Sequence, residues 1–520
     1  MSVPLAAMEV PIAATVAIDT IVLARIGPGA IAAGGIGAAV FVFVASVGVS
    51  IISSVGHEAA YRVGSRDWRG MSSVFYGGVA LACVLGLVAT LALVASAWSL
   101  RALAVDGNAG SDAANYLYGV APGLPFLLVA VCYRGIISLQ PDVKRLTGVA
   151  AATVAVKALL AAVGHAWLLR HGISARGGLL LCGVTTSITF IAMAAAAWLT
   201  RCRSMPQSLG AMTPDATIHD AQRIFRRGLT IGLTAALQAG FFSLVAFVCG
   251  ACSPVDLAAH QVANQCTLLP LMLAFGMSQA AATLTSRAVG AQSGHMALRV
   301  GWEAVYFAIA AMFVIAGVLL ALGHIAIAAI LPTGTPDRDH VASLAWRLVL
   351  VGAFCLAADG AHNVAMGALR GLNQGRLTIY SAIVGYWLVG IPLAWWLAVV
   401  RGIGATGVWI GVGAGLHVSA AMLFYFLYRA KHVMAVENDA RASQRQLPFC
   451  RDKPTTALMR AALPVHRDLA RRDLFDLDVL KAPCSAAPLP RAPRMSAAPR
   501  FCGATTFGRT LLDDAKEAVG

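Results

Sequence analysis

The sequence predicts an all-α polytopic membrane protein with twelve transmembrane helices in two six-helix lobes, related by an internal pseudo-two-fold repeat. The first observation is composition: the 520 residues are 58% hydrophobic and only 12% charged, with a mean hydropathy of +0.74, which is typical of membrane proteins. The second is that apolar segments recur up to about residue 429, each of the roughly 20 residues needed to cross a bilayer. The third is that the second half of the chain repeats the first.

The hydropathy pattern places the twelve spans in order along the chain. Many of them are rich in Gly and Ala, as in "AIAAGGIGAAV", which allows helices to approach closely in lipid. The predicted spans are residues 5–26, 31–55, 73–99, 114–138, 147–169, 177–199, 229–250, 257–283, 302–331, 341–367, 379–400 and 406–429.

The repeat relates the first six spans to the last six. "AIAAGGIGA" at 30–38 aligns with "DLAAHQVAN" at 256–264, and three further matches follow in order at offsets of 226 to 231. Six spans per copy give both copies the same orientation, so the pseudo-two-fold axis runs along the membrane normal. The predicted parts are an N-lobe (1–200), a cytoplasmic linker (201–228), a C-lobe (229–430) and a disordered basic Pro/Ala/Arg-rich tail (431–520).

The charge distribution indicates orientation, not nucleic-acid binding. The formal charge of the whole chain is +15. The part up to residue 430 has 24 Lys and Arg against 14 Asp and Glu, and these charges are spread over short loops. Of these basic residues, sixteen fall on the side of the N-terminus and seven on the opposite side, which favours cytoplasmic termini. We therefore expect a multi-pass protein of the inner (plasma) membrane, surrounded by lipid and without a nucleic-acid partner.

Three of the charged residues inside predicted spans stand out as candidates for function. Asp19 interrupts the apolar run "VAIDTIVLARIGP", Asp359 lies deep in the tenth span, and Lys157 lies near the middle of the fifth. A charge near the bilayer centre costs at least about 2.5–3.5 kcal/mol, so each is a candidate functional residue. An ion pair between Asp19 and Lys157 is one hypothesis; in the other, Lys157 snorkels or faces a water-filled cleft.

Several segments together make the chain resemble the multidrug and toxic compound extrusion (MATE) family, in particular its NorM-like bacterial antiporters. They are "IDTIVLARIGPGAIAA" in the first two spans, "LAAHQVANQ" and "RAVGAQ" in the eighth, and "DGAHNVAMGALRG" in the tenth. The resemblance implies two six-helix lobes that export organic cations, driven by inward flow of protons or sodium. It also implies that Asp19 and Asp359 couple the ion to the drug.

The chemistry of a buried carboxylate suggests how such coupling works. A deprotonated Asp attracts a cationic drug, and a proton or sodium ion arriving from outside removes that attraction. Gln238 stands where the sodium-linked branch of the family commonly has Glu. A neutral amide supplies no charge, so we prefer protons as the coupling ion and keep Na⁺ at Asp359 as the alternative. His362 shares a helical face with Asp359 and is either a proton relay or a packed histidine.

Five aromatic residues are candidates for the walls of a substrate cavity, where cation–π contacts would hold a lipophilic cation. They are Phe241, Phe242, Tyr380, Tyr386 and Trp387. We expect a monomer that needs no cofactor. The rival hypotheses are a flippase for lipid-linked precursors, which usually has several cavity arginines, and an intramembrane enzyme. "HEAAY" at 57–61 lacks the second His of a zinc-protease motif, so an enzyme is disfavoured.

Overall fold

The computed structural model is helical in every regular element that it describes. It describes residues 14–15, 18–19, 21–23, 28–102, 109–139, 144–171, 175–204, 214–331 and 337–445. Within these ranges ten helices are long and apolar enough to cross a membrane, or eleven when the bent pair Pro254–Leu268 and Pro270–Gly290 counts as one span. These eleven correspond to the predicted spans from 31–55 onward. Most of the first predicted span, 5–26, lies outside the described residues.

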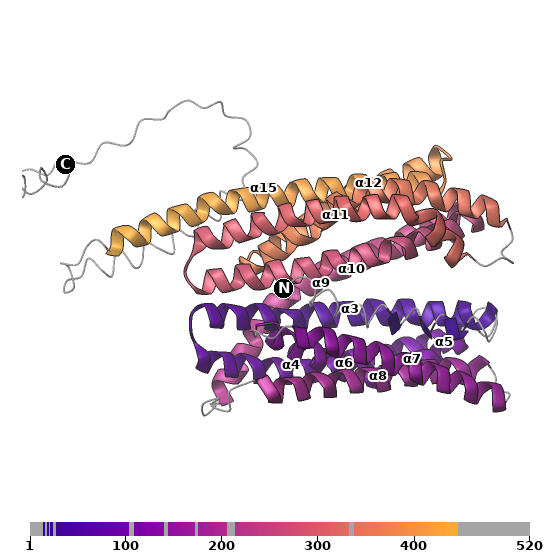
Figure 1. Ribbon diagram of the computed structural model, residues 1–520, viewed down its shortest axis with the longest axis horizontal. Helices are drawn as coiled ribbons and strands as arrows, with labels where there is room; N and C mark the ends of the chain where they lie inside the picture. Colours follow the sequence, from indigo (N-terminus) through magenta and orange to yellow (C-terminus); the bar gives the residue numbers. More distant parts are fainter. Residues whose placement is uncertain are drawn as a thin grey trace, which may run out of the picture. The chain divides into compact units, whose positions relative to one another are not determined.

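The first half of the chain forms the helices that we call the N-lobe (Figure 1). They share one buried apolar core. The fourth span is broken where Pro122 and Pro125 remove backbone donors, so that a 3-10 turn joins two shorter helices. The elements are α3 (Pro28–Gly64), α4 (Trp68–Ala102), α5 (Ala109–Val120), η1 (Ala121–Gly123), α6 (Leu124–Ile137), α7 (Lys144–His171) and α8 (Ala175–Ser204).

The second half begins with α9 (Pro214–Cys252) and continues into the helices that we call the C-lobe, which have an apolar core of their own. One span contains Pro392 and has π-helical turns on both sides of it. The C-lobe elements are α10 (Pro254–Gly290), α11 (Gly294–Ile330), α12 (Arg338–Gly371), α13 (Gly375–Ala382), η2 (Ile383–Gly390), α14 (Ile391–Trp395), η3 (Trp396–Val400) and α15 (Ala405–Arg445).

The helix bounds confirm the predicted repeat. Helices α3 and α10 each have 37 residues, begin at Pro, end at Gly and lie 226 positions apart. The turns that follow them are also equivalent, because Arg66 and Gln292, at the same offset, both adopt a φ of 58°. Two copies of one helix pattern therefore underlie the two lobes.

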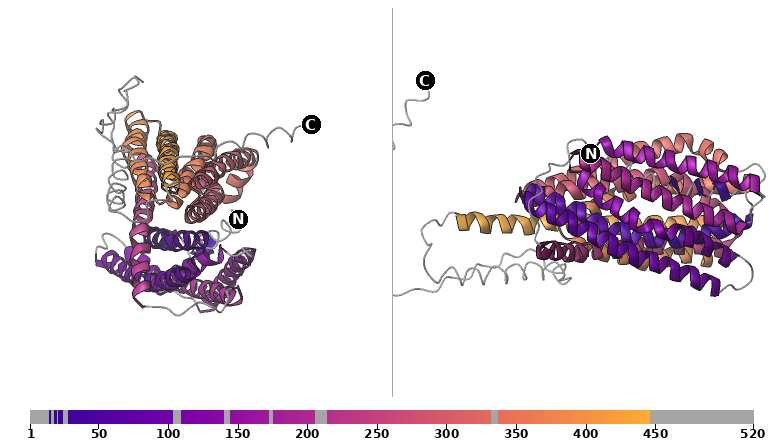
Figure 2. Two further views of the ribbon diagram at one scale, coloured as in Figure 1. Left: turned by 90° about the vertical axis from the view of Figure 1, so that its left-hand side faces the viewer. Right: turned by 90° about the horizontal axis from the view of Figure 1, so that it is seen from below.

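Helix α9 contacts both lobes. Its first part lies against the N-lobe, where the hydroxyl of Ser54 donates to the carbonyl of Ile224 at 3.0 Å. Its second part lies in the C-lobe, where Phe241 stacks on Tyr386. Figure 2 shows α9 running from one group of helices to the other. The predicted linker, 201–228, thus contributes the end of α8 and the start of α9, apart from 205–213, which lie outside the described residues.

The end of the chain is described only in part. Helix α15 runs to Arg445, so the first fifteen residues of the predicted tail are helical. Residues 446–520 lie outside the described ranges, and their predicted disorder stays a prediction.

Close helix contacts in the N-lobe depend on glycine. Helices α5 and α8 cross where Gly119 faces Gly183, and a Cβ on Gly183 would collide with the backbone carbonyl of Tyr116. Such small-residue crossings bring backbones together in lipid, where no hydrophobic effect drives helix association.

We expect Gly183→Ala to destabilise the protein by about 1–3 kcal/mol, because the added methyl group meets backbone that cannot move aside easily. The measurement is the Tm of the purified protein in detergent. The matched control is Gly317→Ala on α11, where an added Cβ meets nothing within 4 Å. Ala favours helix over Gly by about 0.5–1 kcal/mol, so the control should hold or raise the Tm. Equal effects of the two substitutions would contradict the proposed packing.

Candidate functional site

Asp19 and Lys157 form a buried ion pair in the N-lobe. The ammonium of Lys157, on α7, lies 2.5 Å from Oδ1 of Asp19. Both side chains are at most 4% exposed. The structure thus has the ion pair that the sequence suggested, and Lys157 does not snorkel.

Hydroxyl groups complete the surroundings of this pair. Lys157 also donates to the hydroxyls of Thr185 (3.1 Å) and Thr186 (2.8 Å) on α8. Thr186 donates to Oδ2 of Asp19 at 2.8 Å, and the Tyr116 hydroxyl lies 3.4 Å from the same oxygen. An ammonium has three donors, and all three have partners here. The pair is therefore charge-neutral and fully hydrogen-bonded.

Asp359 has different surroundings in the C-lobe. It is half-buried on α12, and its Oδ1 accepts a hydrogen bond from the amide of Asn363 at 2.9 Å. Among the described residues no Lys, Arg or His forms an ion pair with it. Within the part of the chain that the structure describes, Oδ1 of Asn363 and Nε2 of the buried Gln238 have no hydrogen-bond partner. A carboxylate and unused amide groups therefore remain available in this lobe.

His362 belongs to a packed cluster, which agrees with the second of the two alternatives predicted for it. It is completely buried, and its Nε2 lies 2.7 Å from the hydroxyl of Tyr386. Tyr386 is also buried, and its ring stacks on Phe241 at 4.7 Å between centroids. Because Phe241 and Tyr386 cover each other's faces, they have little surface left for a drug.

The other predicted aromatic residues are more accessible. Tyr380 is 47% exposed and Trp387 is 37% exposed. The indole nitrogen of Trp387 donates to the carbonyl of Leu237 on α9 at 3.2 Å, and the rings of Phe241 and Phe242 form an edge-to-face pair. The roles of these rings in a cavity stay predictions.

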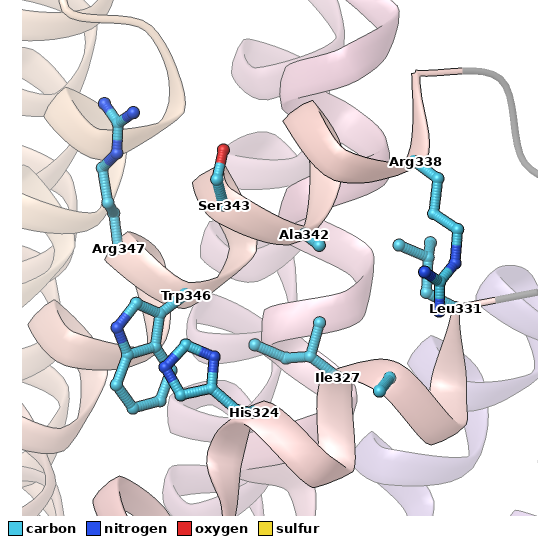
Figure 3. Close-up of a pocket in the computed structure, with 9 residues that line it drawn as sticks. His324, Ile327, Leu331, Arg338, Ala342, Ser343, Trp346 and Arg347 are labelled. Carbon is cyan, nitrogen blue, oxygen red and sulfur yellow. The ribbon is translucent and has the colours of Figure 1, made fainter.

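A cavity of about 380 Å³ lies elsewhere, between α11 and α12. His324 stacks on Trp346 at its wall, and Arg347 points away from this ring pair (Figure 3). None of the predicted site residues lines it. Within the described residues there is also no group of three His, Cys, Asp or Glu side chains that could hold a metal ion.

Sequence reasoning missed the neutral residues that bond the Asp19–Lys157 pair and Asp359. Thr185 and Thr186 are polar residues in the apolar run "LCGVTTSITF", and Asn363 follows Asp359 by four positions, which is one helical turn. The two threonines could have been noticed as polar residues in an apolar run, but nothing in one sequence shows that α8 packs against α7. The contact between Asn363 and Asp359 could have been predicted from their spacing alone.

Comparisons with known proteins agree on one family. The MatE family model matches residues 4–163 and 230–396. A probable multidrug resistance protein NorM of Pseudomonas aeruginosa is 31% identical over 432 residues, which cover 80% of this chain and 86% of that protein. The multidrug resistance protein NorM of Burkholderia vietnamiensis is 28% identical over 437 residues, covering 83% of this chain and 93% of that protein.

Solved structures agree on the fold. A eukaryotic MATE transporter matches with a TM-score of 0.71 at 16% identity, over 84% of this chain and 97% of its own. A multidrug resistance MATE family transporter in an outward-facing conformation matches with a TM-score of 0.73 at 18% identity, over 84% and 95%. These proteins have twelve helices in two lobes, so the fold class predicted from the sequence is confirmed.

The buried ion pair predicts an asymmetric response to substitution. Lys157→Met leaves the Asp19 carboxylate buried without its cation, and we expect it to destabilise the protein by about 3–5 kcal/mol. The double variant Asp19→Asn with Lys157→Met removes both charges and should recover most of this loss. Thermal unfolding of the purified proteins tests both statements. If the losses of stability in Lys157→Met and in Asp19→Asn, each measured alone, add up to the loss in the double variant, the two residues are not coupled and the interpretation is wrong.

Proposed function

The chain belongs to the MatE family of membrane transporters, and from this premise we propose that it exports drugs and other organic cations in exchange for an inward flow of protons or sodium ions. Members of this family are transporters and not enzymes, which removes the enzyme hypothesis. Its curated relatives are named as multidrug resistance proteins. That naming supports drug export as the cellular role.

The observation that carries the proposal is the difference between the two intramembrane carboxylates. Asp19 already has a cation, the ammonium of Lys157, at 2.5 Å. Asp359 has a neutral amide as its partner and no cation within the described part of the chain. An uncompensated carboxylate in a low-dielectric interior attracts a positive ion strongly. Asp359 is therefore our candidate for the site that a drug cation and the coupling ion occupy in turn.

Antiport follows from this alternation. The two ligands are each positive and compete for one negative charge, so binding of one releases the other. If the site binds drug while it is open to one side of the membrane and the ion while it is open to the other, exchange needs no contact between the ligands. The Asp19–Lys157 pair supports a second step, in which a proton or drug displaces the internal ammonium from Asp19.

The coupling ion that we favour is the proton. Gln238 is neutral and buried, so it adds no charge to hold sodium near Asp359. Asp359 and the unpartnered oxygen of Asn363 are the groups that would bind Na⁺ in the alternative. For the orientation we propose cytoplasmic termini in the inner membrane, on the distribution of basic residues, with the protein working as a monomer.

The flippase hypothesis gains no support from the charges. Such a transporter needs free cations for a pyrophosphate group, and the mid-membrane Lys157 has all three of its donors occupied by Asp19, Thr185 and Thr186. Export of cations agrees better with the Asp359 carboxylate, which has no cation as a partner among the described residues.

The first functional prediction concerns Asp359. We expect Asp359→Asn to reduce ethidium efflux from proteoliposomes by about tenfold or more, because an amide cannot exchange one cation for another. The control is Glu303→Gln, which alters an exposed pair with Arg299 on α11 and should retain wild-type efflux. Efflux should follow an imposed pH gradient without sodium. Efflux driven only by a sodium gradient would overturn the proton assignment, and full activity of Asp359→Asn would overturn the site.

The second functional prediction concerns Lys157. When Lys157→Ala removes the ammonium, Asp19 takes up a proton in its place more readily, so the pH profile of efflux should shift to higher pH. The measurement is the initial efflux rate against external pH in wild type and variant. An unchanged profile would exclude Asp19 from ion coupling and leave Asp359 as the coupling carboxylate.

A further inference from the structure

A second group of charges lies at the end of α3, and two of its carboxylates, on Glu58 and Asp220, are buried. The side chain of Glu58 is fully buried and accepts hydrogen bonds from Arg223, at 3.1 Å, and from Arg227. Arg62 lies 3.5 Å from the same carboxylate. We name this group the interlobe charge cluster; its members are Glu58, Arg62, Asp67, Asp220, Arg223 and Arg227.

The cluster is balanced in charge, since it contains three acids and three arginines. Asp220 accepts from Arg62 at 3.0 Å, and Asp67 accepts from Arg62 at 2.5 Å. The backbone N–H of Gly70, together with Arg62, holds the pKa of Asp67 below its usual value, so this acid stays ionised at neutral pH. A buried carboxylate with several guanidinium partners is strongly held, because removing its partners leaves a charge without solvation.

The two sides of the cluster come from different parts of the molecule. Glu58, Arg62 and Asp67 belong to α3 and the turn after it, whereas the other three belong to the first turns of α9. Further along, α9 is anchored in the C-lobe through Phe241, which stacks on Tyr386. The charges therefore hold the start of a C-lobe-anchored helix against the N-lobe.

Uncharged contacts at the same end also join the lobes. Gly64 and Gly290, the equivalent last residues of α3 and α10, lie so close to the opposite helix that a Cβ on either would strike a backbone carbonyl. His57 and Gln279 lie 3.3 Å apart, from Nε2 to Oε1. This end of the bundle is the cytoplasmic one in the orientation proposed above.

We propose that Glu58, bound to Arg223 and Arg227, holds the lobes together at this end and has to release them before the transporter can open toward the cytoplasm. Glu58 is then a positioning residue for transport, because it contacts neither drug nor coupling ion. Only the opening step rests on the proposed transport function; the stabilised closed state does not.

The test is hydrogen exchange of the full-length protein in lipid nanodiscs, comparing wild type with Glu58→Gln. The neutral amide keeps the shape of the side chain but loses the charge. We expect amide exchange to rise about tenfold, within the range of typical coupling energies, at residues 217–232 of α9 and at 279–290 of α10. Exchange in residues 302–320 of α11 should not change.

Three variants test whether Glu58 holds the lobes together at this end or only contributes to overall stability. Glu303→Gln removes an exposed carboxylate from a pair with Arg299 and should leave all exchange rates at wild-type values. Arg227→Gln should reproduce the local increase from the other side of the cluster. The double variant Glu58→Gln with Arg227→Gln should raise exchange at 217–232 by less than the two single variants together, because both substitutions remove the same interaction.

The outcomes decide the proposal independently of drug transport. Increased exchange confined to the ends of α3, α9 and α10 supports the role of Glu58, even if no drug is transported. Unchanged exchange at 217–232, or an increase of the same size throughout α11, overturns it, even if efflux is normal. Where efflux is measurable, Glu58→Gln should change kcat more than it changes KM, since drug binding is not touched.

Discussion

The requirement that charge inside a low-dielectric interior be neutralised governs the arrangement of this protein's polar residues. The ammonium of Lys157 meets a carboxylate and two hydroxyls, and none of its donors is left over. Glu58 meets three guanidinium groups at the end of α3. Each set joins helices that are distant in sequence, so charge neutralisation in this fold also fixes tertiary contacts.

Asp359 departs from this rule, and for that reason we propose it as the site of cation exchange. Its partner in the described structure is an amide that neutralises no charge. The two lobes repeat one helix pattern, yet one contains a carboxylate with an internal cation and the other a carboxylate without one. In a duplicated fold of this kind, the paired charges of one copy can stabilise the structure while the unpaired carboxylate of the other copy remains able to bind an ion.

The sequence was sufficient for the helices and for the repeat, because both depend on hydropathy and on local spacing. The equal lengths of α3 and α10 follow from matched Pro and Gly residues at their ends. It was also sufficient to suggest the Asp19–Lys157 pair, since two opposite charges buried in one lobe have few other partners. It did not indicate that Tyr386 would cover both Phe241 and His362, because that depends on the rotation of η2 against α9 and α12.

Hydropathy alone did not predict that residues 214–228 form the start of a helix packed against the N-lobe. The stretch is polar and basic, which in isolation is typical of a solvated linker. In the structure three of its charged residues form ion pairs with α3, namely Asp220 with Arg62, and Arg223 and Arg227 with Glu58, and Ser54 contacts its backbone. A scale that scores each residue against water cannot register neutralisation by a helix more than 150 positions away.

Helix α9 connects the interlobe charge cluster with the C-lobe, which contains Asp359. Its first turns are held by the interlobe charge cluster, and its middle contains Gln238 and Phe241, next to the aromatic groups of the C-lobe. A change in the charge balance at one end of a continuous helix can alter its position at the other, provided that both ends have two stable arrangements. We propose that a cation bound at Asp359 changes the charge of the C-lobe in which α9 is anchored, and α9 is one continuous element that joins this lobe to the interlobe charge cluster.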